Sequence, residues 1–205
     1  QRTGAMVENR SYLDRLPAAG LKPLWITTTD LPSARSGGWS SPVVAKGRLY
    51  LFAHHKVKVG SGKLAKTQFP YLPPEKRTGM TPEEYEAYEG QRRDEQETRS
   101  NFYRFDEILY CLDAKTGKTI WTNKRTSAYT RFPQSGSPAV IGNSILLLGA
   151  GRLARCINAV DGSDRWQTRL PGEFRDQHMQ SSFALIDQVA VVLCGNLYGL
   201  NLQDG

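Results

Sequence analysis

A fixed spacing of tryptophan and serine constrains the fold of this 205-residue chain more than any other feature. Three tryptophans each precede, by 16 residues, a serine that opens a run of alternating apolar residues; the pairs are Trp25 and Ser41, Trp121 and Ser137, and Trp166 and Ser182. Trp121 and Trp166 are themselves 45 residues apart. A period of this length indicates a repeat architecture, in which each unit buries its apolar face against its neighbours.

Each period contains two predicted hairpins. The first follows the serine, where two short apolar runs flank a polar turn, and these turns are Lys46-Gly47, Gly142-Asn143 and Asp187-Gln188. The second has an Asp or Asn at the end of its first strand and a glycine that closes its loop; these residues are Asp113 and Gly117, Asn158 and Gly162, and Asn201 and Gly205. Gly and Asn tolerate the positive φ of tight hairpin turns. Four short antiparallel strands per period are the size of one propeller blade.

The recurring tryptophans are expected to be structural. One large aromatic side chain per unit is best explained by core packing between neighbouring units, and this interpretation covers Trp25, Trp121 and Trp166. The third copy stops at Gly205, before a tryptophan could follow.

The copy at 109–121 reads Leu-Tyr-Cys-Leu-Asp-Ala-Lys-Thr-Gly-Lys-Thr-Ile-Trp. It resembles the repeat of pyrroloquinoline-quinone (PQQ)-like β-propellers, whose blades carry Thr-Gly-x-x-x-Trp at this place. The later copies depart from the pattern, with Asn158 and Asn201 in place of Asp and with Asp161 and Asp204 in place of Thr. Members of this family typically close eight blades, and they include quinoprotein alcohol dehydrogenases and BamB-type outer-membrane assembly scaffolds.

The resemblance implies an all-β partial propeller, about three four-stranded antiparallel blades of an expected eight, with one charged, partly helical insert. Residues 1–23 form a lead segment and 24–205 form the blades; the divisions are 24–124 with an insert at 54–107, 125–169, and an incomplete blade at 170–205. Because three blades cannot close a ring without leaving strand edges unpaired, we expect an N-terminal portion of a larger propeller.

The insert is polar and divided by charge. Its first half, from Lys56 to Arg77, carries a balance of +5, whereas 81–107 carries −5. Thr81-Pro82-Glu83-Glu84 predicts a helix start with a capping box, and the helix should run to about Arg99 with a Glu89–Arg93 ion pair. The insert either projects as an arm that contacts a partner or covers the channel, or it folds back on its own blade with its two halves neutralising each other.

Motifs for catalysis or metal binding are not found in this sequence. We expect His54 and His55 to end a strand that runs into a polar loop, with side chains on opposite faces that cannot share one ion. His178 stands alone, and lining the channel is a minor alternative for it. Three separate cysteines, Cys111, Cys156 and Cys194, lie in apolar runs and are expected to be core thiols.

Composition excludes two further classes. The net charge of +7 is not concentrated in a basic, aromatic-rich stretch, so specific nucleic-acid binding is not expected. The longest apolar runs are less than half of the roughly 20 residues that a spanning helix needs, so no transmembrane segment is expected. Residues 1–20 contain no apolar run typical of a signal peptide.

The functional prediction is a non-enzymatic scaffold that binds a protein partner through its rim loops and the 54–107 insert, with no catalytic residue, no metal and no cofactor. The alternative is part of a PQQ- and calcium-dependent dehydrogenase. The resemblance implies for such enzymes an adjacent Cys-Cys pair over the quinone and Glu, Asn and Asp around calcium; adjacent cysteines do not occur here. The resemblance also implies export to a periplasm-like space.

Overall fold

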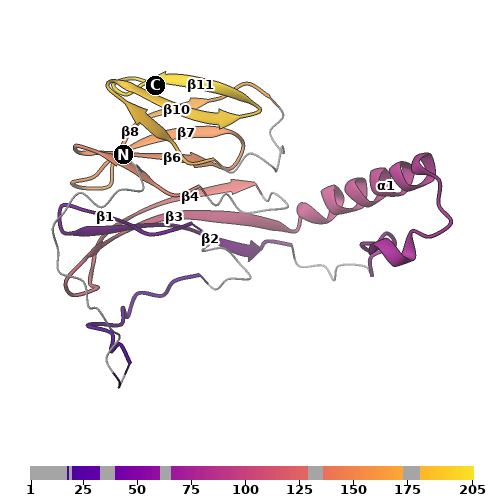
Figure 1. Ribbon diagram of the computed structural model, residues 1–205, viewed down its shortest axis with the longest axis horizontal. Helices are drawn as coiled ribbons and strands as arrows, with labels where there is room; N and C mark the ends of the chain where they lie inside the picture. Colours follow the sequence, from indigo (N-terminus) through magenta and orange to yellow (C-terminus); the bar gives the residue numbers. More distant parts are fainter. Residues whose placement is uncertain (1–17, 19, 33–39, 61–65, 129–135, 173–180) are drawn as a thin grey trace.

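The described part of the chain forms a stack of three antiparallel β-sheets with one projecting arm (Figure 1). The computed structural model describes residues 18, 20–32, 40–60, 66–128, 136–172 and 181–205. This architecture confirms the predicted all-β, partial-propeller fold. Of the expected lead segment, only residues 18 and 20–23 fall within the described residues.

The first two sheets have four strands each, and the third has three. The first contains β1 (Val43–Ala45), β2 (Arg48–Lys58), β3 (Tyr103–Asp113) and β4 (Thr119–Ala128). The second contains β5 (Ala139–Ile141), β6 (Ser144–Gly149), β7 (Leu153–Asn158) and β8 (Asp164–Arg169). The third contains β9 (Ala184–Ile186), β10 (Val189–Cys194) and β11 (Asn196–Asn201). Strands adjacent in sequence pair within each sheet, as a propeller blade requires.

The predicted two-residue turns connect the first two strands of every sheet. Lys46 and Gly47 both have positive φ, 50° and 74°, which is the twist that lets a two-residue turn join antiparallel strands. Gly142 (φ 56°) and Asp187 (φ 50°) occupy the first turn position in the other two sheets. The turn residues therefore set the strand register, and that register places alternate side chains on the two faces of each sheet.

Two apolar layers hold the stack together. The layer between the first and second sheets contains Tyr50, Phe52, Leu109, Cys111, Ile145, Leu147, Ile157 and Ala159. The layer between the second and third sheets is built from side chains such as Leu146, Leu148, Trp166, Phe183 and Val192. The second sheet is buried on both faces, which explains why every residue of β6 is buried.

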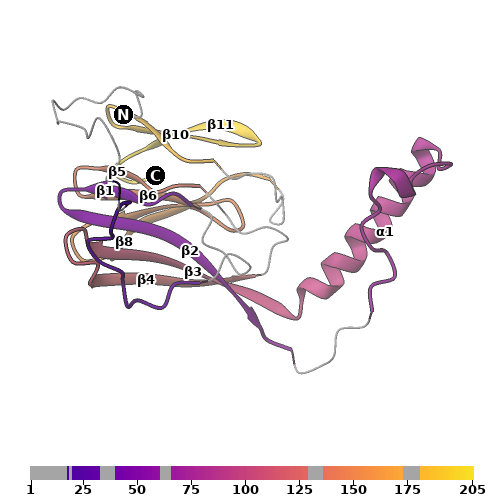
Figure 2. The same cartoon turned by 60° about the horizontal axis from the view of Figure 1, so that its bottom comes forward.

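The arm lies between β2 and β3 and is shorter than the predicted insert. These two strands pair continuously from Arg48 with Asp113 to Lys58 with Tyr103, so the arm spans only 59–102. The expectation that His54 and His55 end a strand was wrong, because this pairing carries β2 on to Lys58. The arm contains a short 3₁₀ helix, η1 (Pro74–Lys76), and α1 (Pro82–Ser100). Figures 1 and 2 show it projecting away from the sheets and not folding back on them.

Helix α1 begins as the sequence predicts. The Thr81 side chain accepts the amide of Glu84, and the Glu84 carboxylate accepts the amide of Thr81, which completes the capping box. The predicted Glu89–Arg93 ion pair was wrong. Glu89 pairs instead with Arg92, one residue earlier, at 3.1 Å, and Arg93 donates to the Glu89 backbone carbonyl. Residues three and four positions after Glu89 both lie on the same face of the helix as Glu89. Arg92 forms the ion pair because it is buried against the rest of the arm.

The outer face of the third sheet is apolar and exposed. Ile186, Val189, Leu193 and Leu197 all point away from the stack, and Leu193 and Leu197 are 55% and 71% exposed. Strand β11 is also the edge of its sheet, whereas β3 and β7 each pair with a fourth strand. A contiguous apolar face beside an open edge favours association with another surface.

We therefore expect the double substitution Leu193→Lys and Leu197→Lys to reduce self-association of the 205-residue chain, measured by sedimentation velocity over a range of concentrations. Because both side chains are exposed, the free energy of unfolding should change by only about 0.5 kcal/mol. The neighbouring substitution Val192→Lys is the control, since Val192 is buried in the layer facing the second sheet and should unfold the chain. Unchanged association of the double variant would contradict this assignment.

Candidate functional site

Each predicted tryptophan lies over the loop glycine of the following unit. The pairs are Trp25 with Gly117, Trp121 with Gly162, and Trp166 with Gly205. A Cβ atom on Gly162 would come within 2.6 Å of the Trp121 ring, and one on Gly205 would come within 2.7 Å of the Trp166 ring. All three glycines have positive φ, at 69°, 80° and 77°. These positions therefore require glycine twice over, for backbone conformation and for space.

A hydrogen bond that the sequence reasoning missed accompanies each tryptophan. The side chain two residues after the tryptophan donates to the carbonyl of the same glycine; the bonds are Thr27 Oγ1 to Gly117 at 2.8 Å, Asn123 Nδ2 to Gly162 at 2.8 Å, and Thr168 Oγ1 to Gly205 at 3.1 Å. Trp25 and Trp166 also donate their ring N–H to a backbone carbonyl of the loop that they cover, at 3.1 and 3.0 Å. The segment around Trp25 thus contacts the first sheet in the same way as β4 contacts the second sheet and β8 contacts the third.

The Asp and Asn residues of the repeat organise the loops that carry these glycines. Asp113 Oδ1 accepts the amides of Lys115 and Thr116, at 3.0 and 2.8 Å, and the Thr116 hydroxyl at 2.9 Å. These hydrogen bonds from Thr116 lower the pKa of Asp113. Asn158 and Asn201 each accept the amide two residues further on, at 3.1 and 2.9 Å. The side-chain oxygens are thus engaged within their own turns.

Replacing Gly162 by Ala should destabilise the chain more than replacing Gly47 by Ala. Both glycines have positive φ, so both substitutions carry a backbone cost of about 1 kcal/mol. A methyl group at Gly47 meets nothing within 4 Å, whereas at Gly162 it meets the Trp121 ring, so the difference in free energy of unfolding should be about 1–3 kcal/mol. Urea unfolding of both variants measures it. Equal destabilisation would show that the contact with Trp121 contributes nothing.

A buried carboxylate joins the first two sheets at the end from which the arm projects. Glu107 on β3 is fully buried, and its carboxylate accepts from Arg125 Nη1 at 2.6 Å and from the backbone amide of Ala150. His54 Nε2 lies 3.5 Å away on the paired strand β2. Burial alone would raise the pKa of Glu107, but the His54 ring, the Arg125 charge and the Ala150 amide together outweigh burial and lower it.

The same place in the next repeat is occupied by a cation. Arg152 is also buried, and its guanidinium donates to the backbone carbonyl of Cys194 in the third sheet. A carboxylate that accepts an amide in one interface is thus matched by a guanidinium that donates to a carbonyl in the next. The sequence analysis assigned Glu107 to the charged insert and therefore missed its structural role. The available signal was its position in the repeat: Glu107 precedes Cys111 by four residues, and Arg152 precedes Cys156 by four residues.

Glu107→Gln should cost about 3 kcal/mol of unfolding free energy at pH 7, because it leaves Arg125 without its buried counter-charge. Since the folded-state pKa of Glu107 is lowered, its contribution is complete above the ordinary glutamate pKa of about 4.3 and is lost as the pH falls through the folded value. The difference between the wild-type chain and the variant should therefore shrink in acid. Urea unfolding at neutral and acidic pH checks this, with exposed Glu86→Gln as the control. A difference that does not depend on pH would refute the assignment.

Helix α1 and the segment that precedes it are joined by side-chain hydrogen bonds and an aromatic pair. Glu95 on α1 accepts the Thr67 hydroxyl at 2.7 Å and the amides of Gln68 and Phe69 at 2.9 Å each, and these bonds, led by that from Thr67, lower its pKa. Phe69 packs edge-on against Tyr88, whose hydroxyl donates to the Pro70 carbonyl at 2.7 Å. The extended segment that precedes α1 is thereby fixed along one side of the helix.

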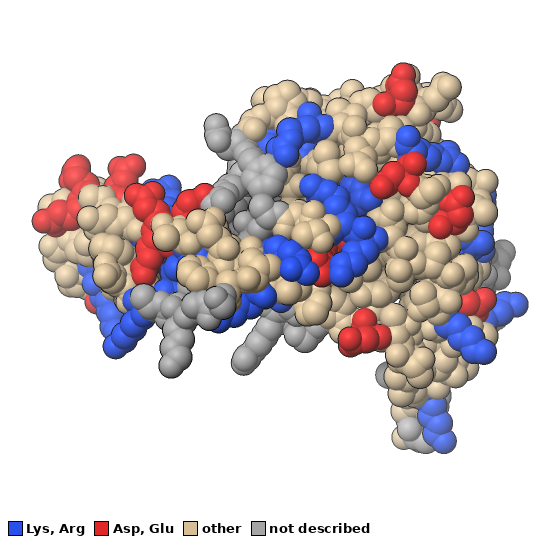
Figure 3. Space-filling view, turned by 180° about the vertical axis from the view of Figure 1, so that it is seen from behind, with Lys and Arg blue, Asp and Glu red and all other residues tan. Residues whose placement is uncertain are grey.

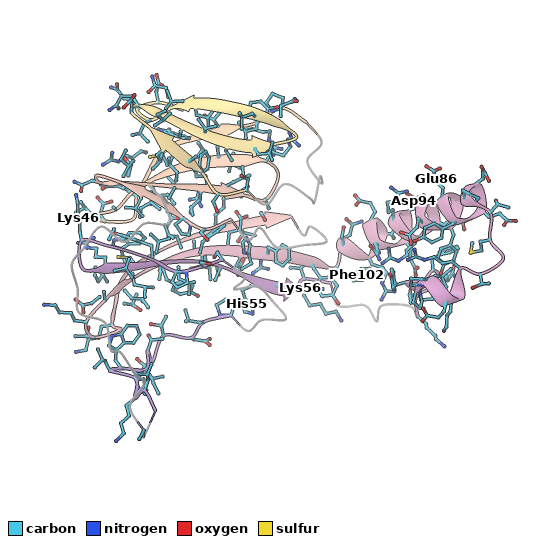
Figure 4. The ribbon with its side chains drawn as sticks, viewed as in Figure 1. Lys46, His55, Lys56, Glu86, Asp94 and Phe102 are labelled. Atoms are coloured by element: carbon cyan, nitrogen blue, oxygen red, sulfur yellow. The ribbon has the colours of Figure 1, made fainter. Side chains whose placement is uncertain are left out.

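Charge is divided between the two sides of the arm. Glu83, Glu86 and Asp94 are exposed on α1, whereas Lys66 and Lys76 are exposed on the extended segment. Figure 4 shows Glu86 and Asp94 on the side of the helix that faces away from this segment. In the space-filling view from behind, acidic side chains gather mainly along one side of the arm and basic side chains mainly along the other (Figure 3). The charge division read from the sequence thus corresponds to a preference for two sides, with Arg93 on α1 and Glu75 on η1 as exposed exceptions.

The residues that could hold a metal or quinone do not converge. Among the described residues, no three His, Cys, Asp or Glu side chains lie together in a way that could hold a metal ion. Cys111, Cys156 and Cys194 are buried in three different sheets, and burial raises the pKa of the first two. The carboxylates of Asp113 and Asp161 are engaged in their own turns. His178 lies outside the described residues.

Repeated four-stranded sheets, joined by a tryptophan stacked on a loop glycine, define a PQQ-like β-propeller repeat protein. A family model described as outer membrane protein assembly factor BamB matches residues 97–205. This match covers more than half of the chain, and the chain belongs to this family of PQQ-like repeat proteins. No curated protein matches the sequence.

Two solved structures share partial similarity with the chain. BamB from Moraxella catarrhalis is 16% identical, with a TM-score of 0.36, over 48% of this chain and 30% of that one. The quinohemoprotein alcohol dehydrogenase ADHIIG from Pseudomonas putida HK5 is 14% identical, with a TM-score of 0.35, over 50% of this chain and 24% of that one. The matched region thus spans less than a third of either of these proteins.

Proposed function

We propose that this chain is a non-enzymatic sector of a larger PQQ-like propeller and that it serves as a protein-binding scaffold. The observation that carries the proposal is the arm at 59–102, which extends from the end of the first sheet into solvent (Figure 2). None of the described residues of this arm belongs to the apolar layers of the sheets, and long insertions commonly carry recognition.

The base of the arm supports this role because it is a continuation of the sheet. Strands β2 and β3 remain paired up to Lys58 and Tyr103, and the Val59 amide then donates to the Phe102 carbonyl at 2.8 Å. The Phe102 ring packs directly on Gly60, where a side chain would collide with it. An arm held in one orientation loses little conformational entropy when a partner binds, which is the energetic advantage of a rigid scaffold.

The family supports an extracytoplasmic location. The matching model describes an outer membrane assembly factor, so we place this chain in the periplasm or an equivalent exported compartment. Within the described residues, no helix has both the length and the apolar character needed to cross a membrane. The exposed apolar face of the third sheet supports the assignment to a larger propeller, because a further blade would cover it as the third sheet covers the second.

The direct test replaces residues 59–102 by Asn-Gly, which joins Lys58 to Tyr103 through a two-residue turn that their antiparallel pairing accepts. We expect the three sheets to remain folded, with loss of the helical signal in circular dichroism. Proteins that crosslink to the complete chain in extracts of its own organism should disappear with the arm, by quantitative mass spectrometry. The Glu86→Gln chain, which keeps the arm, is the matched control.

Two outcomes would contradict the proposal. An identical set of crosslinked proteins with and without residues 59–102 would remove the arm from the function. The second outcome is stoichiometric binding of PQQ in the presence of calcium, measured by absorbance and by dye-linked alcohol oxidation. This result would favour the dehydrogenase alternative over the scaffold.

A further inference from the structure

We propose that the tip of the arm binds an acidic segment of a protein partner through Arg77, and this inference rests on the proposed function. The tip is defined by Tyr71, Arg77, Tyr85, Glu89 and Arg92, which come from the extended segment, from the end of η1 and from α1. It lies at a distance from the sheets and is separate from the tryptophan and glycine contacts that build the stack (Figure 1).

Arg77 is held in place by two aromatic rings. Its guanidinium lies 4.5 Å from the centre of the Tyr85 ring and 5.5 Å from that of Tyr71. Its Nε donates to the Leu72 carbonyl at 2.8 Å, and its Nη2 donates to the Tyr71 hydroxyl at 3.1 Å. The guanidinium is therefore fixed in one plane, which leaves its Nη1 group without a hydrogen-bond partner among the described residues.

The charge of Arg77 is not neutralised within the described part of the arm. Arg92, which also lies against the Tyr71 ring, has a carboxylate partner in Glu89 at 3.1 Å. Glu95 is occupied by Thr67 and two backbone amides. Among the described residues, the Arg77 guanidinium by contrast meets a carbonyl, a hydroxyl and two ring faces, all of them uncharged. A preoriented guanidinium without a counter-charge is suited to a carboxylate, which it can bind with two parallel hydrogen bonds.

The surroundings of Arg77 indicate what accompanies that carboxylate. Tyr71 is 59% exposed, and the neighbouring Pro70 and Pro74 are exposed as well, so an apolar side chain of the partner can pack beside the ion pair. Rigid tyrosine and arginine side chains are the residues that most often dominate binding energy in protein interfaces. One guanidinium flanked by tyrosine and proline matches a single carboxylate next to an apolar side chain, and it does not match the run of closely spaced phosphates in a nucleic acid, so a protein segment fits better.

The test uses the complete chain and a short fluorescein-labelled peptide in which Asp and Leu are spaced by Gly and Ser. We expect saturable binding by fluorescence anisotropy, lost when Asn replaces every Asp of the peptide. Arg77→Gln should weaken binding at least about tenfold, because it removes a charge-assisted, two-bond contact. Arg77→Lys should be intermediate, since it keeps the charge and loses the planar geometry. Arg93→Gln, an equal charge change at an exposed position of α1, should stay within about twofold.

Helix content by circular dichroism shows whether each variant keeps the arm folded. If Arg77→Gln unfolds the arm, the binding of Arg77→Lys is used to test the inference instead. The inference is overturned if the complete chain does not bind the Asp peptide, if it binds the Asn peptide equally well, or if Arg93→Gln weakens binding as much as Arg77→Gln. It is also overturned if an oligothymidylate of similar length competes more strongly than the Asp peptide. If crosslinked partners depend on residues 59–102 but are unchanged in Arg77→Gln, the scaffold function stands and the tip assignment falls.

Discussion

The stacking of a tryptophan ring on a positive-φ glycine is the contact on which the rest of this structure depends. It occurs three times, and each time it joins one repeat to the next through residues about 40 to 90 positions apart. The apolar faces of the sheets are buried against one another, and this contact joins the sheets at the loops beside those layers. In every copy, the side chain two positions after the tryptophan donates a hydrogen bond to the carbonyl of the same glycine.

The arm is attached to the first sheet of this stack and does not follow the repeat pattern. Two strands of the first sheet extend beyond the length found in the second sheet, and the additional pairs support 59–102. Its stability comes from Glu95, Tyr88 and the Tyr71, Arg77 and Tyr85 stack, and not from an apolar core. Recognition and folding are therefore divided between two parts of the molecule, one polar and projecting and one apolar and stacked.

Sequence reasoning succeeded where the signal was local and failed where contacts were long-range. The turn residues at Lys46, Gly142 and Asp187 and the capping box at Thr81 were predictable, because each depends on residues adjacent in the chain. The continuation of β2 through His54 and the burial of Glu107 were not, because polar residues in a strand carry no sign of the partner that will satisfy them across a sheet interface. The ion pair of Glu89 with Arg92 was also missed, although both residues lie on α1, because the burial of Arg92 depends on how the rest of the arm packs.

The period, the hairpin turns, the family and the place of the insertion can all be read from the order of the amino acids. The period is visible in the sequence because each unit needs turn residues that accept positive φ, one tryptophan and one glycine beneath its ring. The coordinates were needed to see that the insertion projects, that its acidic and basic side chains gather mainly on different sides, and that Arg77 lacks a counter-charge among the described residues. These properties follow from which side chains meet in space, and residues at similar sequence distances can meet or remain apart.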